Sequence, residues 1–150
     1  MLSAMLKDHG EIHWCWVMKW DRPAPEQQLL RTLLRNLNEW RRKAGKEFLL
    51  CGRMEKPYCR VHAPEYALPS LIAGRNLVTS SVLSSAWSAP NGDKAQFLVN
   101  FMPHEQQLEI EIPPENRVAV MDAEGKQLAT LAGKTPVRVP ALQAVMLRLV

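Results

Sequence analysis

The stretch SSVLSSAWSAPNGDKAQFLVNF, residues 80–101, contains two alternating runs separated by a short polar turn. Successive side chains of a β-strand point to opposite faces, so each run fits a half-buried or buried strand. Asn91-Gly92 between them is a strong hairpin signal, because both residues tolerate positive φ. The stretch therefore predicts an antiparallel hairpin, and it shows where a two-residue period begins in this chain.

The same period continues to residue 150. QLEIEIP, residues 107–113, alternates three apolar side chains with two glutamates that we expect to face water. RVAVMDAEGKQLATL, residues 117–131, predicts a second hairpin that turns at Glu124-Gly125, and AVMLRLV follows after VRVP. Its inner face is expected to carry Val145, Leu147 and Leu149. Six or seven short strands with regular turns over residues 76–150 predict an antiparallel β-sandwich.

Residues 1–55 have a different pattern. Pro25 is expected to open a helix that Gly45 ends, with one apolar stripe made of Leu29, Leu30, Leu33, Leu34, Leu37 and Trp40. IHWCWVMKW before this helix and EFLLCGRM after it each fit a strand, so the three together predict a β–α–β unit. Two parallel strands do not form a stable sheet alone. We therefore expect this unit to pack against further α/β structure upstream, or to bury its surfaces by oligomerising.

Composition indicates an ordinary globular chain, with 47% hydrophobic and 23% charged residues. No stretch approaches the roughly 20 apolar residues of a membrane span, so no membrane contact is expected. The first residues lack the basic and apolar regions of a signal peptide. These features predict no particular cellular compartment.

The formal net charge of +4 is unevenly distributed. Residues 1–60 hold 12 of the 19 Lys and Arg but only 7 of the 15 Asp and Glu. Much of this excess is at Arg41, Arg42, Lys43 and Lys46, where cations complement the dipole at a helix end. Together with Arg31 and Arg35 this leaves nucleic-acid binding as a third possibility, but no recognisable nucleic-acid motif supports it.

The three cysteines show neither a disulfide framework nor a zinc-binding spacing. Cys15 and Cys51 lie in apolar runs and are expected to be small buried residues, whereas Cys59 is the candidate for an exposed thiol. No metal-ligand cluster, phosphate-binding loop or nucleophile elbow is found, so we expect no metal and no cofactor.

The order of these pieces resembles the C-terminal end of glycoside-hydrolase-like proteins. FLLCGRM is followed by VLSSAWSAPNGDKAQFLVNF, then by VAVMDAEGKQLATL and a closing VRVPALQAVMLRLV. In such proteins a (β/α)₈ barrel precedes an all-β domain; the layout is similar to an uncharacterised bacterial family and, more distantly, to the α-amylase superfamily. The resemblance implies an α+β chain, with a barrel-terminal β–α–β remnant at residues 1–55, a linker at 56–75 and a β-sandwich at 76–150. Catalysis in such enzymes lies on the barrel, so most of the active site would be absent here.

A few residues are candidates for a carbohydrate site. Asp21 follows the predicted strand 12–20 at the functional edge of a barrel, although a loop or capping carboxylate is the commoner explanation, and no catalytic pair is assigned. Trp14, Trp16 and Trp20 would share one strand face, where they either stack on a sugar or belong to a core. Arg53 would reach a carboxylate or a sugar hydroxyl, or form a structural ion pair. Trp40 and Trp87 are expected to be packing residues.

Two functions follow from these observations. The first is the C-terminal portion of a carbohydrate-processing protein, inactive alone, whose sandwich has a structural or docking role and whose partner is an upstream barrel. It predicts an exposed apolar patch at Leu29, Leu33, Leu37 and Trp40. The second is a stand-alone carbohydrate-binding or protein-interaction module that forms a homo-oligomer through its helix. Substrate and linkage stay open in both.

Overall fold

The computed structural model describes residues 25–69 and 76–150. In this part of the chain two helices precede a series of short strands. The helices are α3 (Pro25–Arg42) and α4 (Lys46–Leu49). The strands are β1 (Arg53–Glu55), β2 (Arg60–His62), β3 (Glu65–Pro69), β4 (Asn76–Ser80), β5 (Val82–Ser88), β6 (Lys94–Asn100), β7 (Gln106–Glu111), β8 (Val118–Met121), β9 (Gln127–Leu131), β10 (Lys134–Val139) and β11 (Ala144–Leu149).

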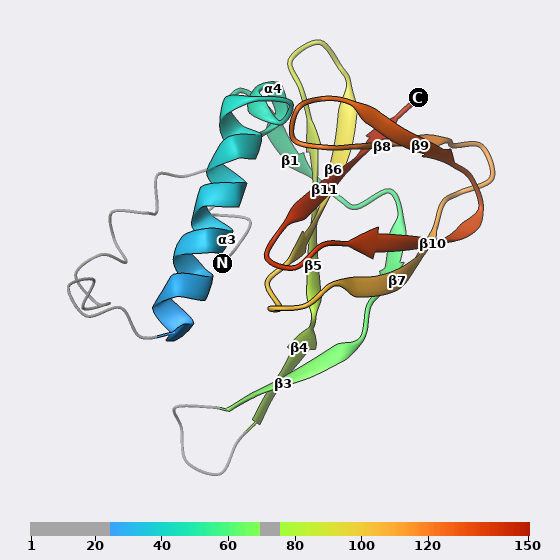
Figure 1. The fold of residues 1–150 in the computed structure, drawn as a ribbon. Helices are drawn as coiled ribbons and strands as arrows, with labels where there is room; N and C mark the ends of the chain where they lie inside the picture. Colours follow the sequence, from blue (N-terminus) through green and yellow to red (C-terminus); the bar gives the residue numbers. More distant parts are fainter. Residues whose placement is uncertain (1–24, 70–75) are drawn as a thin grey trace.

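The strands form antiparallel sheets. The largest has the order β1-β5-β6-β11-β8-β9, a second has the order β10-β7-β2, and β3 pairs with β4 alone. In Figure 1, α3 runs along one side of the six-stranded sheet, while β7 and β10 lie on its other side. The predicted α+β class with an antiparallel β-sandwich is confirmed.

The predicted hairpins are also present. β5 and β6 pair along their whole length, and the turn between them has Gly92 at φ 89°. The side chain of Asn91 accepts a hydrogen bond from the backbone N–H of Asp93 at 3.0 Å, which closes this turn. β8 and β9 are joined by a turn with Gly125 at φ 82°.

The alternation of β6 supplies two cores, one on each face of the large sheet. Phe97 and Val99 face α3 and α4, where they join Trp40 and other apolar side chains. Leu98 faces the smaller sheet, where Leu108, Ile110, Val145 and Leu147 pack, as the pattern of β7 and β11 predicted. The molecule therefore has three layers: a helix, a six-stranded sheet and a three-stranded sheet.

The apolar stripe of α3 packs against the large sheet of the same chain. Leu33, Leu37 and Trp40 are buried against the large sheet, and the Trp40 ring meets Phe97 edge to face with centroids 5.6 Å apart. Leu30 and Leu34 are partly buried, and Leu29 is 40% exposed. The expected exposed apolar patch is therefore wrong. Periodicity shows which face of a helix is apolar, but not which sheet covers it.

The predicted strand EFLLCGRM is wrong as far as Gly52. Lys46–Leu49 forms the short helix α4, which buries Phe48 and Leu49, and the strand begins only at Arg53. Gly45 makes this turn possible, since a Cβ there would lie 2.7 Å from the Trp40 carbonyl oxygen. β1 then pairs antiparallel with β5. The other strand of the predicted β–α–β unit, residues 12–20, lies outside the described residues.

The burial of the two described cysteines is the opposite of what the sequence predicted. Cys51 follows α4 and is exposed, whereas Cys59 is buried in the core between the two sheets. The helical turn at residues 46–49 explains the first, because it turns Phe48 and Leu49 inward and leaves Cys51 outside. Cys15 lies outside the described residues.

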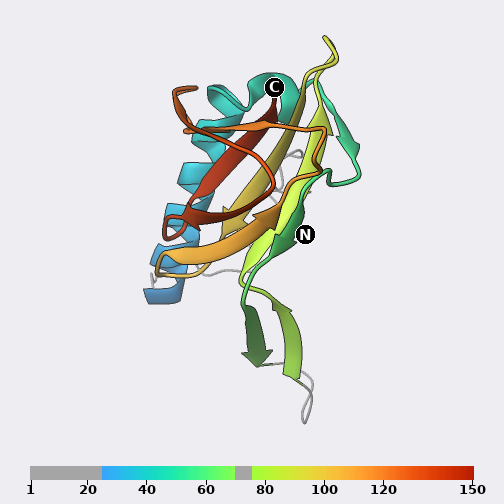
Figure 2. The same ribbon diagram turned by 90° about the vertical axis from the view of Figure 1, so that its right-hand side faces the viewer.

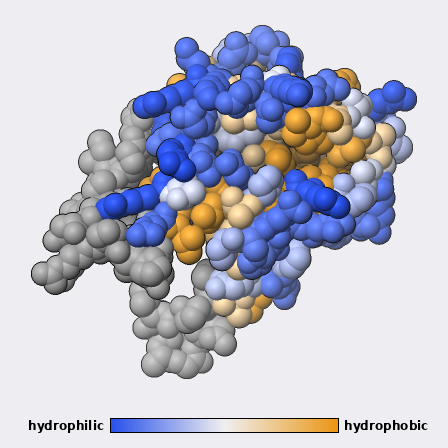
Figure 3. Space-filling model, in the orientation of Figure 1, coloured by the Kyte–Doolittle hydropathy of each residue, from blue (hydrophilic) through white to orange (hydrophobic). Residues whose placement is uncertain are grey.

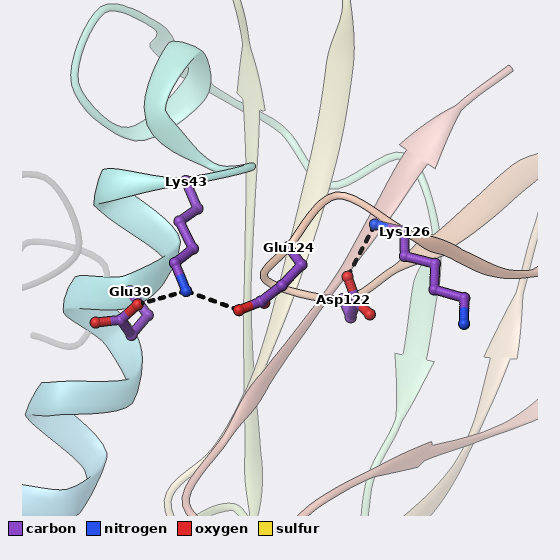
Figure 4. A network of polar contacts seen from close by, with 5 residues as sticks. All are labelled: Glu39, Lys43, Asp122, Glu124 and Lys126. Atoms are coloured by element: carbon purple, nitrogen blue, oxygen red, sulfur yellow. Dashed lines mark hydrogen bonds and ion pairs between the residues drawn. The ribbon is translucent and has the colours of Figure 1, made fainter.

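Polar contacts fasten the C-terminal end of α3 to the β8–β9 turn. The ammonium of Lys43 lies 2.8 Å from Glu39 and 2.7 Å from Glu124 (Figure 4). The backbone N–H of Ala44 also donates to the Ala123 carbonyl. The hydrogen bonds with Glu124 and Glu39 raise the pKa of Lys43. These surface contacts fix the position of the helix more than they stabilise it.

The segment 56–75, predicted as a linker, contains two strands. β2 pairs with β7 and so belongs to the smaller sheet. β3 and β4 form a two-stranded ribbon that extends away from the body of the molecule (Figure 2). At its base, the Tyr66 ring lies edge-on to Phe101.

In the described part of the chain, no helix is long and apolar enough to cross a membrane. Hydrophilic side chains cover much of the visible surface, and a hydrophobic area lies between β8–β9 and β10 (Figure 3).

Candidate functional site: a groove beside β2

Most of the residues predicted for a carbohydrate site lie outside the described residues. These are Asp21, Trp14, Trp16 and Trp20, whose roles stay predictions. Arg53 begins β1 with a side chain that is 84% exposed, and its guanidinium lies 3.2 Å from the Glu55 carboxylate. Trp40 and Trp87 are both buried, which confirms them as packing residues.

A groove of about 530 Å³ lies where β2 meets the end of β7. One wall is the segment 57–60, which leads into β2, and the other is residues 111–114, which leave β7. β2 and β7 pair so that Arg60 is directly opposite Glu111. The backbone register thus brings together two segments that are far apart in the sequence. The lining is formed by Pro57, Tyr58, Cys59, Arg60, Glu111, Ile112, Pro113 and Pro114.

The charged groups of the groove are only loosely paired. The guanidinium of Arg60 approaches the Glu111 carboxylate to 3.6 Å, and the His62 imidazole lies 3.7 Å from the same carboxylate. Both distances exceed that of a hydrogen bond. The side chains of Arg60 and Glu111 are 75% and 51% exposed, so water or a ligand can reach both. Their hydrogen-bonding capacity is therefore available to a ligand.

The wall that carries Tyr58 and Cys59 is fixed from the core. The hydroxyl of Tyr58 donates to the carbonyl of Leu147 on β11. The side-chain amide of Gln96, which is buried, accepts from the Cys59 N–H at 2.9 Å and donates to the Cys59 carbonyl at 3.0 Å. The Gln96 side chain thus makes the hydrogen bonds to Cys59 that a neighbouring strand would otherwise make. These bonds position the wall at which the groove begins.

Burial also changes the pKa values of the two ionisable side chains on this wall, Tyr58 and Cys59. It raises the pKa of the Cys59 thiol to about 11, and it raises the pKa of the Tyr58 hydroxyl above its usual value. Both groups are therefore neutral near pH 7. Cys59 is no nucleophile at that pH, since the thiolate is the reactive form.

Carboxylates in the described part of the chain are surface groups. No described Asp or Glu side chain is buried, and several lie within 4 Å of a Lys or Arg. A hydrogen bond from Lys43 lowers the pKa of Glu39, and hydrogen bonds from Ser88 and Arg53 lower that of Glu55. No three His, Cys, Asp or Glu side chains in residues 25–69 and 76–150 are placed to hold a metal ion.

No sequence pattern indicated this groove directly. Prolines surround Tyr58 in the segment predicted as a linker, and alternation placed Glu111 on the water-facing side of its strand. Neither pattern shows that β2 exists or that it pairs with β7. The buried glutamine of β6 was a possible clue, because an amide inside an apolar run needs a polar partner.

Comparison with known proteins finds similarity to a solved structure. No family model and no curated protein matches the chain. A solved structure from Bacillus halodurans C-125, described as that of a putative alpha-N-acetylgalactosaminidase, is similar with 15% sequence identity and a TM-score of 0.43. The similarity covers 79% of this chain and 23% of that chain, so this chain spans less than a quarter of that protein's length.

Proposed function

We propose that this chain is the C-terminal portion of a glycoside-hydrolase-like protein that processes carbohydrate. Its β-sandwich then has a structural or docking role and takes no direct part in hydrolysis. In this proposal residues 1–55 end a barrel-like domain, residues 56–75 connect the two parts, and residues 76–150 form most of the sandwich, to which β1 and β2 each add one strand. The layout of the sequence, which resembles such proteins, is the first support.

The observation that carries the non-catalytic role is the state of the carboxyl groups. Glycoside hydrolysis uses two carboxyl groups, one of which acts as an acid because its surroundings raise its pKa. The described carboxylates are instead unburied, and hydrogen bonds lower the pKa of Glu39 and Glu55. Such groups are good ion-pair partners and poor proton donors near neutral pH.

The packing of α3 bears on the alternative, a module that oligomerises through its helix. Leu33, Leu37 and Trp40 are buried against the large sheet of the same chain. Most of the apolar stripe of this helix is therefore unavailable to a second copy. The same packing removes the exposed apolar patch that was expected of a C-terminal portion, so in this proposal the contact with upstream structure uses other surfaces.

Two measurements on the purified 150-residue chain test the proposal. A panel of nitrophenyl glycosides should release no nitrophenol above the buffer rate, and light scattering after size exclusion should give a monomer. Hydrolysis that survives repurification would overturn the non-catalytic role. A stable dimer would favour the alternative module, and the variant Leu29→Ser would then show whether the remaining apolar surface of α3 holds it together.

A further inference from the structure

We propose that the groove beside β2 binds one or two residues of a neutral oligosaccharide, which Arg60 and Glu111 hold by hydrogen bonds. This inference rests on the proposed function, since it assumes that the chain works next to carbohydrate. It assigns a binding role to a surface that the structural or docking role leaves unused.

The size of the groove suits a small ligand. Its volume of about 530 Å³ falls within the range of about 300 to 1,000 Å³ that is typical of ligand sites. Both walls are backbone segments next to paired strands, so the groove exists before a ligand arrives.

The charges around the groove favour a neutral ligand. Arg60 and Lys134 flank Glu111 in the ladder from opposite sides, and Glu109 on the same strand lies 2.9 Å from Lys134. The formal charges of the two cations and the two carboxylates balance. An anionic ligand would meet the carboxylate of Glu111, and a cationic ligand would meet the guanidinium of Arg60.

Hydroxyl groups match what the two side chains offer. A guanidinium only donates hydrogen bonds and a carboxylate only accepts them, whereas each sugar hydroxyl does both. Neighbouring hydroxyls of one sugar ring can therefore accept from Arg60 and donate to Glu111 at the same time. Hydrogen bonds to charged groups are the stronger kind, which makes this pair the main source of affinity.

The remaining lining suits the C–H groups of a sugar ring. Pro57 and the partly buried Tyr58 lie on one wall, and Pro113 and Pro114 lie on the other. The dihedral φ of each proline is fixed, and the Tyr58 hydroxyl is held by Leu147. Little conformational entropy is then lost on binding, which increases affinity.

Nuclear magnetic resonance titration of the full ¹⁵N-labelled chain tests this inference. The probes are maltohexaose, cellohexaose, xylohexaose, laminarihexaose and chitohexaose, with hexagalacturonate as an anionic control. At least one neutral probe should shift the amide signals of residues 58–60 and 111–112 in a saturable way. Hexagalacturonate should not.

Matched variants locate the binding energy. Glu111→Gln and Arg60→Ala should each weaken binding about tenfold, the loss expected for a hydrogen bond to a charged group. Glu109→Gln is the control, because Glu109 is on the same strand and sheet face but does not line the groove. It should change the affinity less than twofold.

The inference is overturned if no neutral probe shifts these amides, or if Glu109→Gln weakens binding as much as Glu111→Gln. It is also overturned if the shifts map only to residues 12–20. Any of these results leaves the proposed function standing, since that proposal falls only if the chain hydrolyses glycosides or assembles through its helix.

Discussion

At the scale of single residues, the buried amide of Gln96 has the clearest structural role. It makes two hydrogen bonds with the backbone of Cys59 and donates a third to the Ser84 hydroxyl at 2.7 Å. The segment before β2 has no strand neighbour at this point, so these bonds replace a ladder. Through Cys59, this side chain positions one wall of the groove.

Replacing Gln96 with leucine should therefore be costly. Gln96→Leu keeps the volume but leaves the N–H and the carbonyl of Cys59 unsatisfied in the core, at about 1 to 3 kcal/mol each. We expect the free energy of unfolding to fall by about 2 to 5 kcal/mol in urea titrations. Gln107→Leu, at an exposed position of β7, should change it by less than about 0.5 kcal/mol. Equal effects would show that Gln96 has no special role.

The thiol of Cys59 predicts a pH dependence at the alkaline end. Burial raises its pKa from about 9 to about 11, so above pH 9 the unfolded chain loses a proton that the folded chain keeps. The free energy of unfolding therefore decreases as the pH rises from about 9 to about 11. At pH 10 the decrease is about 1 kcal/mol. Below pH 9 the effect is absent.

The variant Cys59→Ala isolates this contribution. Between pH 8 and pH 10, its free energy of unfolding should fall about 1 kcal/mol less than that of the wild-type chain. Tyr58 contributes to both chains with the same sign, and most of its contribution cancels because burial, rather than Cys59, is the main cause of its raised pKa. Urea titrations at the two pH values measure it, and equal losses in both chains would contradict the prediction.

At the scale of elements, the sequence predicted the β-hairpins better than it predicted the segment that follows α3. The Asn91-Gly92 and Glu124-Gly125 turns are decisive because positive φ restricts the residues that fit. FLLC at residues 48–51 was ambiguous, since a short apolar run fits a buried strand and a helical turn alike. The burial of Phe48 against Phe97 decided for the helix.

The packing of α3 on the sheet gives the next prediction. Trp40 is fully buried and lies in the same core as Phe97 and Trp87, so Trp40→Ala leaves a large cavity between helix and sheet. It should cost about 3 to 5 kcal/mol in urea titrations, and it should increase the binding of a hydrophobic dye.

A second position on the same helix serves as the control. Leu29 is 40% exposed, and Leu29→Ala should cost less than about 1 kcal/mol with no change in dye binding. If Trp40→Ala is as mild as Leu29→Ala, α3 does not depend on the sheet, and its contact surface must lie elsewhere.

At the scale of the whole molecule, the groove shows what sequence patterns miss. Alternation assigned Glu111 to the outer face correctly, but nothing in KPYCRVH indicates that Arg60 will be its cross-strand neighbour. That neighbour relation depends on the pairing of β2 with β7, which is long-range. Local periodicity encodes which side of an element is buried, whereas pairing between distant segments emerges only when the cores form.

The shared core also predicts how the molecule unfolds. Because one apolar cluster contains residues of α3, α4 and the large sheet, helix and sheet should unfold as one cooperative unit. Native-state hydrogen exchange in increasing denaturant should therefore give the amides of α3 and β6 the same global opening. The β3–β4 ribbon pairs only with itself and is the internal control, expected to open at lower denaturant. If α3 opened well before β6, residues 1–55 and 76–150 would be separate units, and the helix would be free to follow an upstream domain.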